Sequence, residues 1–105
     1  MTKVFMINVK KDWDISGAEL YGELIPVFRD TIPHVFDISK MCHELREAMV
    51  DISEDDYLLL GGNVIPNSVA VAIVLSKYPT VNLLIYSMKD KEYVPRTVAR
   101  HHVQL

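Results

Sequence analysis

Hydrophobic residues fall into short blocks separated by polar turns, and the clearest blocks lie between residues 56 and 86. Residues 57–60 (YLLL) form a continuous apolar run that ends at the turn Gly61-Gly62-Asn63. A short run bounded by glycine is typical of a strand that is buried on both faces of a parallel sheet. Residues 81–86 form a second apolar run. The pattern predicts a βαβ unit over residues 57–86, with a right-handed crossover.

The helix of this unit is expected over residues 66–77. Pro66 suits the first helical turn, where the N–H that proline lacks has no intrahelical partner. Pro79 ends the helix, because the residue before a proline is disfavoured in helical geometry. Apolar side chains occupy the whole circumference over residues 69–75, so we expect burial on more than one side, and a second copy of the chain is the simplest cover. The predicted interface consists of Val71, Val74, Leu75 and Tyr93.

A second helix is predicted over residues 38–51. Its apolar residues recur at spacings of three and four, which gives one buried stripe. The members of this stripe are Ile38, Met41, Cys42, Leu45, Ala48, Met49 and Ile52. Asp37 or Ser39 is expected to cap the start of the helix. A turn-rich connection, residues 29–34, precedes it.

The outer strands are less regular. Residues 3–9 are almost entirely apolar and predict a strand inside the sheet. Residues 24–28 predict an edge strand, because Pro26 cannot donate a hydrogen bond to a neighbouring strand. Residues 92–98 predict a last strand, antiparallel to the one before it and again at an edge.

These elements predict an α/β fold: a single small sandwich with a mostly parallel central sheet, two helices and an antiparallel edge strand near the C-terminus. The length fits one domain over residues 1–105, with residues 99–105 as a flexible tail. Trp13, in the polar segment 10–17, is expected to be partly buried.

Composition narrows the possible functions. The chain is 50% hydrophobic and 24% charged, which is typical of a globular protein, and its net charge of −3 argues against general nucleic-acid binding. Cys42 is the only cysteine, so an internal disulfide is excluded and a reducing cytoplasm is favoured. We expect neither a signal peptide nor a membrane span, because no apolar run approaches the length of about 20 residues that a span requires.

The segment DDYLLLGGNVIPNSVAVAIVLSKYPTVNLLIYSMKDKEYVPRTV resembles a group of small proteins of tailed bacteriophages. In that group an acidic residue precedes an apolar strand that ends in Gly-Asp-Pro or a similar turn. An Ala-rich helix, a Val-x-Leu-Leu strand, a Trp-Asp turn and a tyrosine-bearing last strand follow. The matching positions here are Asp56, the glycine turn, residues 81–86 and Tyr93. The chain departs from the pattern with Tyr86-Ser87 in place of Trp-Asp, and with Asn63 in place of aspartate. The resemblance implies a phage origin and a location in the cytoplasm of the infected cell, and it implies no activity.

The glycine turn is the candidate ligand site. A turn between a strand and a helix start is where open α/β sheets bind ligands, with help from free N–H groups and the helix dipole. The candidate residues are Gly61, Gly62, Asn63, Asn67 and Ser68. The G-x-G-x-x-G fingerprint and the phosphate-loop lysine are both missing, so a structural turn is the favoured interpretation.

No complete catalytic or metal motif is present. Ser68 lacks the G-x-S-x-G context of a nucleophile, and His43-Glu44 lacks the second histidine of a zinc helix. The acidic residues 53–56 are expected to form a solvated turn rather than a cation site. We therefore expect no catalytic residue, no metal site and no cofactor.

Two functions remain after these exclusions. The favoured one is a non-enzymatic phage protein that binds other proteins, either as a modulator or inhibitor of a host protein or as an assembly subunit, and that forms a homodimer. The alternative is a nucleotide- or anion-binding domain, with or without enzymatic activity, that uses the glycine turn.

Overall fold

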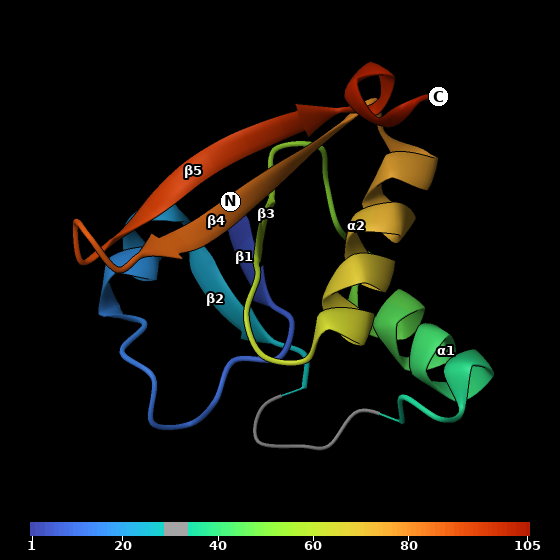
Figure 1. Ribbon diagram of the computed structural model, residues 1–105, viewed down its shortest axis with the longest axis horizontal. Coiled ribbons are helices and arrows are strands. Elements are labelled where there is room, and N and C mark those ends of the chain that lie inside the picture. Colours follow the sequence, from blue (N-terminus) through green and yellow to red (C-terminus); the bar gives the residue numbers. More distant parts are fainter. Residues whose placement is uncertain (29–33) are drawn as a thin grey trace.

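Figure 1 shows the computed structural model, which describes residues 1–28 and 34–105. Within these residues, five strands form one sheet in the order β2-β1-β3-β4-β5. The strands are β1 (Lys3–Met6), β2 (Glu23–Pro26), β3 (Tyr57–Leu59), β4 (Thr80–Ser87) and β5 (Glu92–Ala99). All neighbouring strands are parallel except β4 and β5, which are antiparallel. The predicted α/β fold with a mostly parallel sheet and an antiparallel C-terminal strand is thus confirmed.

The helices connect these strands on opposite faces of the sheet. Helices α1 (Ile38–Ala48) and α2 (Val64–Lys77) share one face, on the right in Figure 1, whereas the 3-10 helix η1 (Ser16–Tyr21) lies on the other. A right-handed crossover requires this split, because the chain moves in one direction across the sheet from β1 to β2 and in the reverse direction afterwards. The strand order is that of flavodoxin-type sheets.

Each face of the sheet has its own core, because side chains along a strand alternate between the two faces. Phe5 and Leu58 point toward α1 and α2, where they meet Met41, Leu45, Ala70 and Val74. Val4, Met6 and Leu59 point the other way and pack with Ala18 of η1 and with Tyr93. The second core is the smaller one, since a short 3-10 helix covers that face where α1 and α2 cover the first.

Several predicted boundaries shift by a few residues. The strand expected over residues 3–9 ends at Met6, although Ile7 still donates its N–H to the Leu59 carbonyl at 3.3 Å. Helix α2 starts at Val64 rather than Pro66, because Asn63 caps it. Helix α1 ends at Ala48 rather than at residue 51. Pro26 and Pro95 lie in the two edge strands, as predicted.

Asp37 caps α1, as predicted, by accepting the N–H of Lys40 at 3.2 Å. At the other end of the chain, residues 100–103 form a short 3-10 helix, η2, where a tail was expected. The guanidinium of Arg100 donates to the carbonyls of Leu75 and Tyr78, at 2.8 and 3.0 Å. These carbonyls lie at the end of α2, so Arg100 satisfies acceptors that the helix itself leaves open. The expected turn-rich connection, except for His34, lies outside the described residues.

Candidate binding site

The carboxyl ends of β1 and β3 lie side by side at the lower edge of the sheet in Figure 1. The chain leaves β1 toward η1 on one face and leaves β3 toward α2 on the other. Ligands of open α/β sheets bind where successive connections diverge in this way. The candidate site is therefore built from the segments that follow these strands, residues 7–15 and 60–64.

The side chain of Asn8 joins the two segments. It is fully buried, its Oδ1 accepts the N–H of Asn63 at 2.9 Å, and its Nδ2 donates to the Phe28 carbonyl at 2.8 Å. Gly62 has a φ of 80° and lies so close to Asn8 that a Cβ at this position would collide with the Asn8 carbonyl oxygen. Both the backbone conformation and the available space therefore require glycine at position 62.

Asn67 closes the turn from the side of α2. Its Oδ1 accepts the N–H of Gly61 at 3.1 Å, and its Nδ2 donates to the carbonyls of Gly61 and Asn63, at 2.7 and 2.6 Å. The side chain of Asn63 in turn accepts the N–H of Ile65 at 2.9 Å. The N–H groups of Gly61 and Asn63 are thus bonded within the chain, so an anion would have to displace these bonds.

The fold brings the predicted ligand-binding residues together. Gly61, Gly62, Asn67 and Ser68 line an open pocket of about 380 Å³, and Asn63 lies next to them as the cap of α2. The remaining wall is apolar and consists of Leu60, Val64 and Val71. The hydroxyl of Ser68 donates to the Val64 carbonyl at 2.8 Å. What this pocket presents is therefore mainly an apolar wall rather than a set of free donors.

Trp13 is the residue of the site that sequence reasoning undervalued. Its indole lies over Gly61, where a Cβ would fall 2.7 Å from the ring atom Cζ3. The residue as a whole is 43% exposed, which fits the partial burial that was predicted. The available signal was the order Asp12-Trp13-Asp14, an aromatic residue between two carboxylates in an otherwise polar loop.

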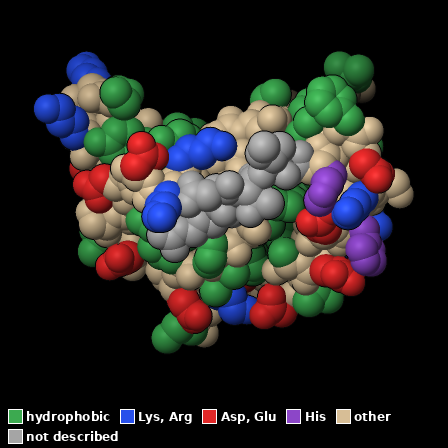
Figure 2. Space-filling view, turned by 90° about the horizontal axis from the view of Figure 1, so that it is seen from below, with side chains coloured by type: hydrophobic (Ala, Val, Ile, Leu, Met, Phe, Trp, Pro, Cys, Tyr) green, Lys and Arg blue, Asp and Glu red, His purple; other side chains and the backbone are tan. Residues whose placement is uncertain are grey.

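Trp13 also lines a larger cavity of about 530 Å³, which shares Leu60 and Gly61 with the first pocket. Its other walls are Asp12, Asp14, Ile85, Tyr86, Met88 and Tyr93. The cavity exists because pairing of β4 with β3 ends at Leu84, whereas β4 continues to Ser87. In Figure 2 the molecule projects at the upper left, on the side of the β4–β5 turn, and the surface is hollow beside this projection.

Tyr93 fixes the Asp-Trp-Asp loop to the sheet. Its hydroxyl donates to the Asp14 carbonyl at 2.9 Å, and its ring packs edge-on against Tyr86 with centroids 5.2 Å apart. Burial, together with the negative charge of Asp14, raises the pKa of Tyr93. Two hydrogen bonds from Ser16 lower the pKa of the Asp14 carboxyl, so this wall carries a negative charge at neutral pH.

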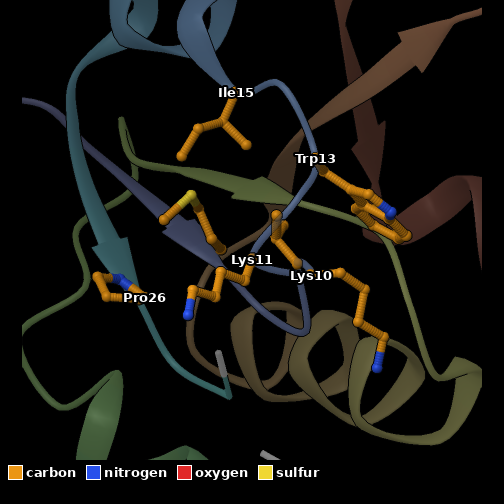
Figure 3. A pocket seen from close by; sticks show the side chains of 7 residues that line it. Lys10, Lys11, Trp13, Ile15 and Pro26 are labelled. Atoms are coloured by element: carbon orange, nitrogen blue, oxygen red, sulfur yellow. The ribbon is translucent and has the colours of Figure 1, made fainter. Parts of the chain in front are cut away.

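A third, small cavity of about 70 Å³ lies on the η1 side of the same loop. Figure 3 shows that Lys10 and Lys11, which both line it, extend in different directions. Its remaining lining is mostly apolar and includes Ile15 and Pro26. Two divergent ammonium groups and so little space do not make a cradle for a phosphate.

Other candidate residues have structural partners. Asp56, in the acidic segment 53–56, is buried and accepts the N–H groups of Lys3 and Ser53, each at 2.9 Å. On the exposed side of α1, Nε2 of His43 lies 3.0 Å from Oε1 of Glu47. Within residues 1–28 and 34–105, no group of three or more His, Cys, Asp or Glu side chains is placed to hold a metal ion. None of the described helices is both long and apolar enough to cross a membrane.

The comparison with protein families matches residues 2–100 to the model of the phage Pam3 gp32-like proteins. The chain belongs to this phage protein family. The family expected from the order of strand, glycine turn, Ala-rich helix and tyrosine-bearing strand is thus confirmed as one of small phage proteins. Neither the curated proteins nor the solved structures contain a match.

The residues predicted to contact a second chain divide into two groups. Val74 and Tyr93 are buried in the chain's own cores, whereas Val71 and Leu75 are half-buried at the surface of α2. The helix was expected to be buried on more than one side. The monomer fully buries one side of it, through Pro66, Asn67, Ala70 and Val74, and partly buries its flanks, where Val71 and Leu75 pack against the same core.

Proposed function

We propose that this phage protein is a non-enzymatic binding protein that acts by contacting another protein. The observation that carries the proposal is the apolar groove, which we define as the two pockets joined at Leu60 and Gly61. Its large hydrophobic side chains are solvent-exposed: Met88 is 81% exposed, Val64 is 70% exposed, and Ile85, Tyr86 and Trp13 are each more than 40% exposed. Contiguous exposed apolar surface of this kind marks protein interaction sites.

The chemistry of the groove supports binding rather than catalysis. Its hydroxyl groups are those of Ser68, Tyr86 and Tyr93, and those of Ser68 and Tyr93 donate to backbone carbonyls. Among the described residues that line the groove there is no histidine or lysine to act as a base, and the Tyr93 hydroxyl bonds to the backbone carbonyl of Asp14 rather than to its carboxylate. A nucleophile needs such a partner within hydrogen-bond reach.

The partner is either a host protein, whose activity the phage protein then modulates, or a phage protein with which it assembles. Its place of action is the cytoplasm of the infected cell. The family membership supports a role during infection, and the free Cys42 fits a reducing compartment.

Affinity capture followed by mass spectrometry tests this proposal. Wild-type protein is incubated with lysate of uninfected host cells and, separately, of infected cells, which separates host partners from phage partners. A protein captured by the wild type should be lost with the groove variant Ile85→Asp/Met88→Asp. The matched control is Leu20→Asp, an apolar-to-acidic change at a residue on η1 that is 87% exposed and lines neither pocket. Equal capture by all three proteins would contradict a role for the groove.

The alternative, an anion or nucleotide site at the glycine turn, rests on the position of the turn at the start of α2. The hydrogen bonds of Asn8 and Asn67 weigh against it, since they already occupy the N–H groups of Gly61 and Asn63. We expect no rise in melting temperature with ATP, GTP, NAD or inorganic phosphate. A ligand specific for the folded state must raise it, so such a rise would favour the alternative. Loss of that rise in Gly62→Val, with the fold intact, would place the site at the turn.

A further inference from the structure

The deeper part of the groove has an unusual lining for a protein-binding surface. Its lining combines Asp12, Trp13 and Asp14, which are consecutive in the loop after β1, with Tyr86 and Met88 from the end of β4 and the turn after it. We call this part of the groove, the cavity of about 530 Å³, the acidic aromatic pocket. An apolar side chain would fill it but would leave two carboxylates next to a dry contact, which is costly.

Within residues 1–28 and 34–105, no ion pair neutralises these two carboxylates. The ion pairs within the described part of the chain join Lys3 to Asp51, His34 to Glu44 and His43 to Glu47, and none includes Asp12 or Asp14. Asp14 does accept two hydrogen bonds from Ser16, both through Oδ1. These bonds hold the carboxylate in place and keep it ionised, so it adds a fixed negative charge to the wall.

The aromatic residues of the pocket favour a cation as well. A cation is attracted to the face of an indole or phenol ring, most strongly to tryptophan. Trp13 lies against Gly61 and Tyr86 packs against Tyr93, so both rings already line the pocket before a partner arrives. Arginine suits this combination better than lysine, because its planar guanidinium stacks on aromatic rings and pairs with carboxylates through two parallel hydrogen bonds.

We propose that the acidic aromatic pocket receives an arginine side chain of the partner protein, stacked on Trp13 and paired with Asp12 and Asp14. This inference rests on the proposed function and names the chemistry of its partner.

Trp13 makes the inference directly measurable, because it is the only tryptophan of the chain. The probe is the blocked peptide acetyl-Ala-Arg-Leu-Ala-amide, titrated while tryptophan emission is recorded. The comparison peptide carries citrulline, a neutral residue of nearly the same shape, in place of arginine. We expect a saturable change with the arginine peptide and binding weaker by about tenfold or more with the citrulline peptide, because both the cation–π contact and the charge-assisted hydrogen bonds are lost.

The variant Asp12→Asn/Asp14→Asn removes both charges but keeps an oxygen that can accept the hydrogen bonds from Ser16. It should weaken binding of the arginine peptide by about tenfold or more and leave binding of the citrulline peptide unchanged. The control is Asp55→Asn, an exposed carboxylate in the loop before β3, at the opposite edge of the sheet. Raising the salt concentration from about 0.05 to 0.5 M should weaken binding of the arginine peptide more than binding of the citrulline peptide, because salt screens exposed charges.

Several results would overturn the inference: no saturable binding of the arginine peptide, equal affinity for the two peptides, or an unchanged affinity in the Asp12→Asn/Asp14→Asn variant. These results differ from a failure of the proposed function. A partner captured through the groove by wild type and equally by Asp12→Asn/Asp14→Asn would keep protein binding and remove only the arginine. Binding of the arginine peptide without any captured protein would keep the arginine site and remove the proposed role in protein binding.

Discussion

The buried amide oxygen of Asn8 accepts the backbone N–H of Asn63 at 2.9 Å, over a sequence separation of 55 residues. The same side chain donates to the carbonyl of Phe28, so one residue connects the end of β1, the end of β2 and the start of α2. These three segments form the edge of the sheet on which the groove opens. The shape of the groove therefore depends on a polar side chain with no exposed surface.

Replacement of Asn8 by alanine should lower the free energy of unfolding by about 2–4 kcal/mol, because a buried donor and a buried acceptor lose their partners together. Urea denaturation of the variant and the wild type measures the difference. Lys89→Ala, an exposed change in the β4–β5 turn, is the control and should shift the value by less than about 0.5 kcal/mol. If Asn8→Ala also changed the free energy of unfolding by less than about 0.5 kcal/mol, water would have to replace both hydrogen bonds.

The two glycines of the turn should respond differently to alanine. Gly62→Ala meets the backbone of Asn8 and a φ of 80°, so we expect a loss of more than about 1 kcal/mol of stability. Gly61→Ala meets only the ring of Trp13, a side chain that can move. The Gly61→Ala variant should therefore lose less stability than Gly62→Ala. It should also shift the emission of Trp13 toward longer wavelength, because the displaced indole gains contact with water. Denaturation and fluorescence spectra of both variants, recorded together, separate the two effects.

Most of the fold could be predicted from the sequence, because its signals are local. The run over residues 57–60, the turn after it and the apolar stripe of α1 each determine their own element and need no distant partner. Asp37 and the strand prolines likewise act on their immediate neighbours. The short helix η1 could not be predicted, because its six residues (SGAELY) carry no helical periodicity. It is held by long-range contacts, such as Ala18 against the second core.

The site could be predicted only in part, because sequence signals are local and the site combines distant segments. The glycine turn was located correctly, since a strand, two glycines and a helix are adjacent in sequence. Its hydrogen bonds could not be read from sequence, because Asn8 reaches it from another strand. The acidic aromatic pocket combines the loop around Trp13 with the end of β4, more than 70 positions later, and no local pattern joins them. Side chains contributed by distant segments are known only once the sheet order is known.

Tyr93 should make stability depend on alkaline pH. Its raised pKa means that the folded chain favours the neutral phenol, so this contribution is complete below the ordinary tyrosine pKa of about 10 and is lost as the pH rises through the higher folded value. Tyr93→Phe removes the hydrogen bond to Asp14 and should cost about 0.5–1.5 kcal/mol at neutral pH. The difference between the two proteins should then shrink above about pH 10. A constant difference between pH 7 and 11 would show that the phenol titrates equally in both states.

Self-association through α2 is the last prediction, and the structure narrows the surface it would use. Val64, Ser68, Val71 and Leu75 follow one another at spacings of three and four, so they form one stripe beside the buried side of the helix. The stripe is apolar except for Ser68, and an apolar stripe on each of two copies can pair about a twofold axis.

We expect light scattering to give the mass of a dimer at micromolar concentration. Ser68→Arg places a charge in the middle of the stripe and should return the protein to a monomer, whereas Leu20→Arg on η1 should leave the dimer intact. A monomer mass for the wild type at every concentration would contradict self-association.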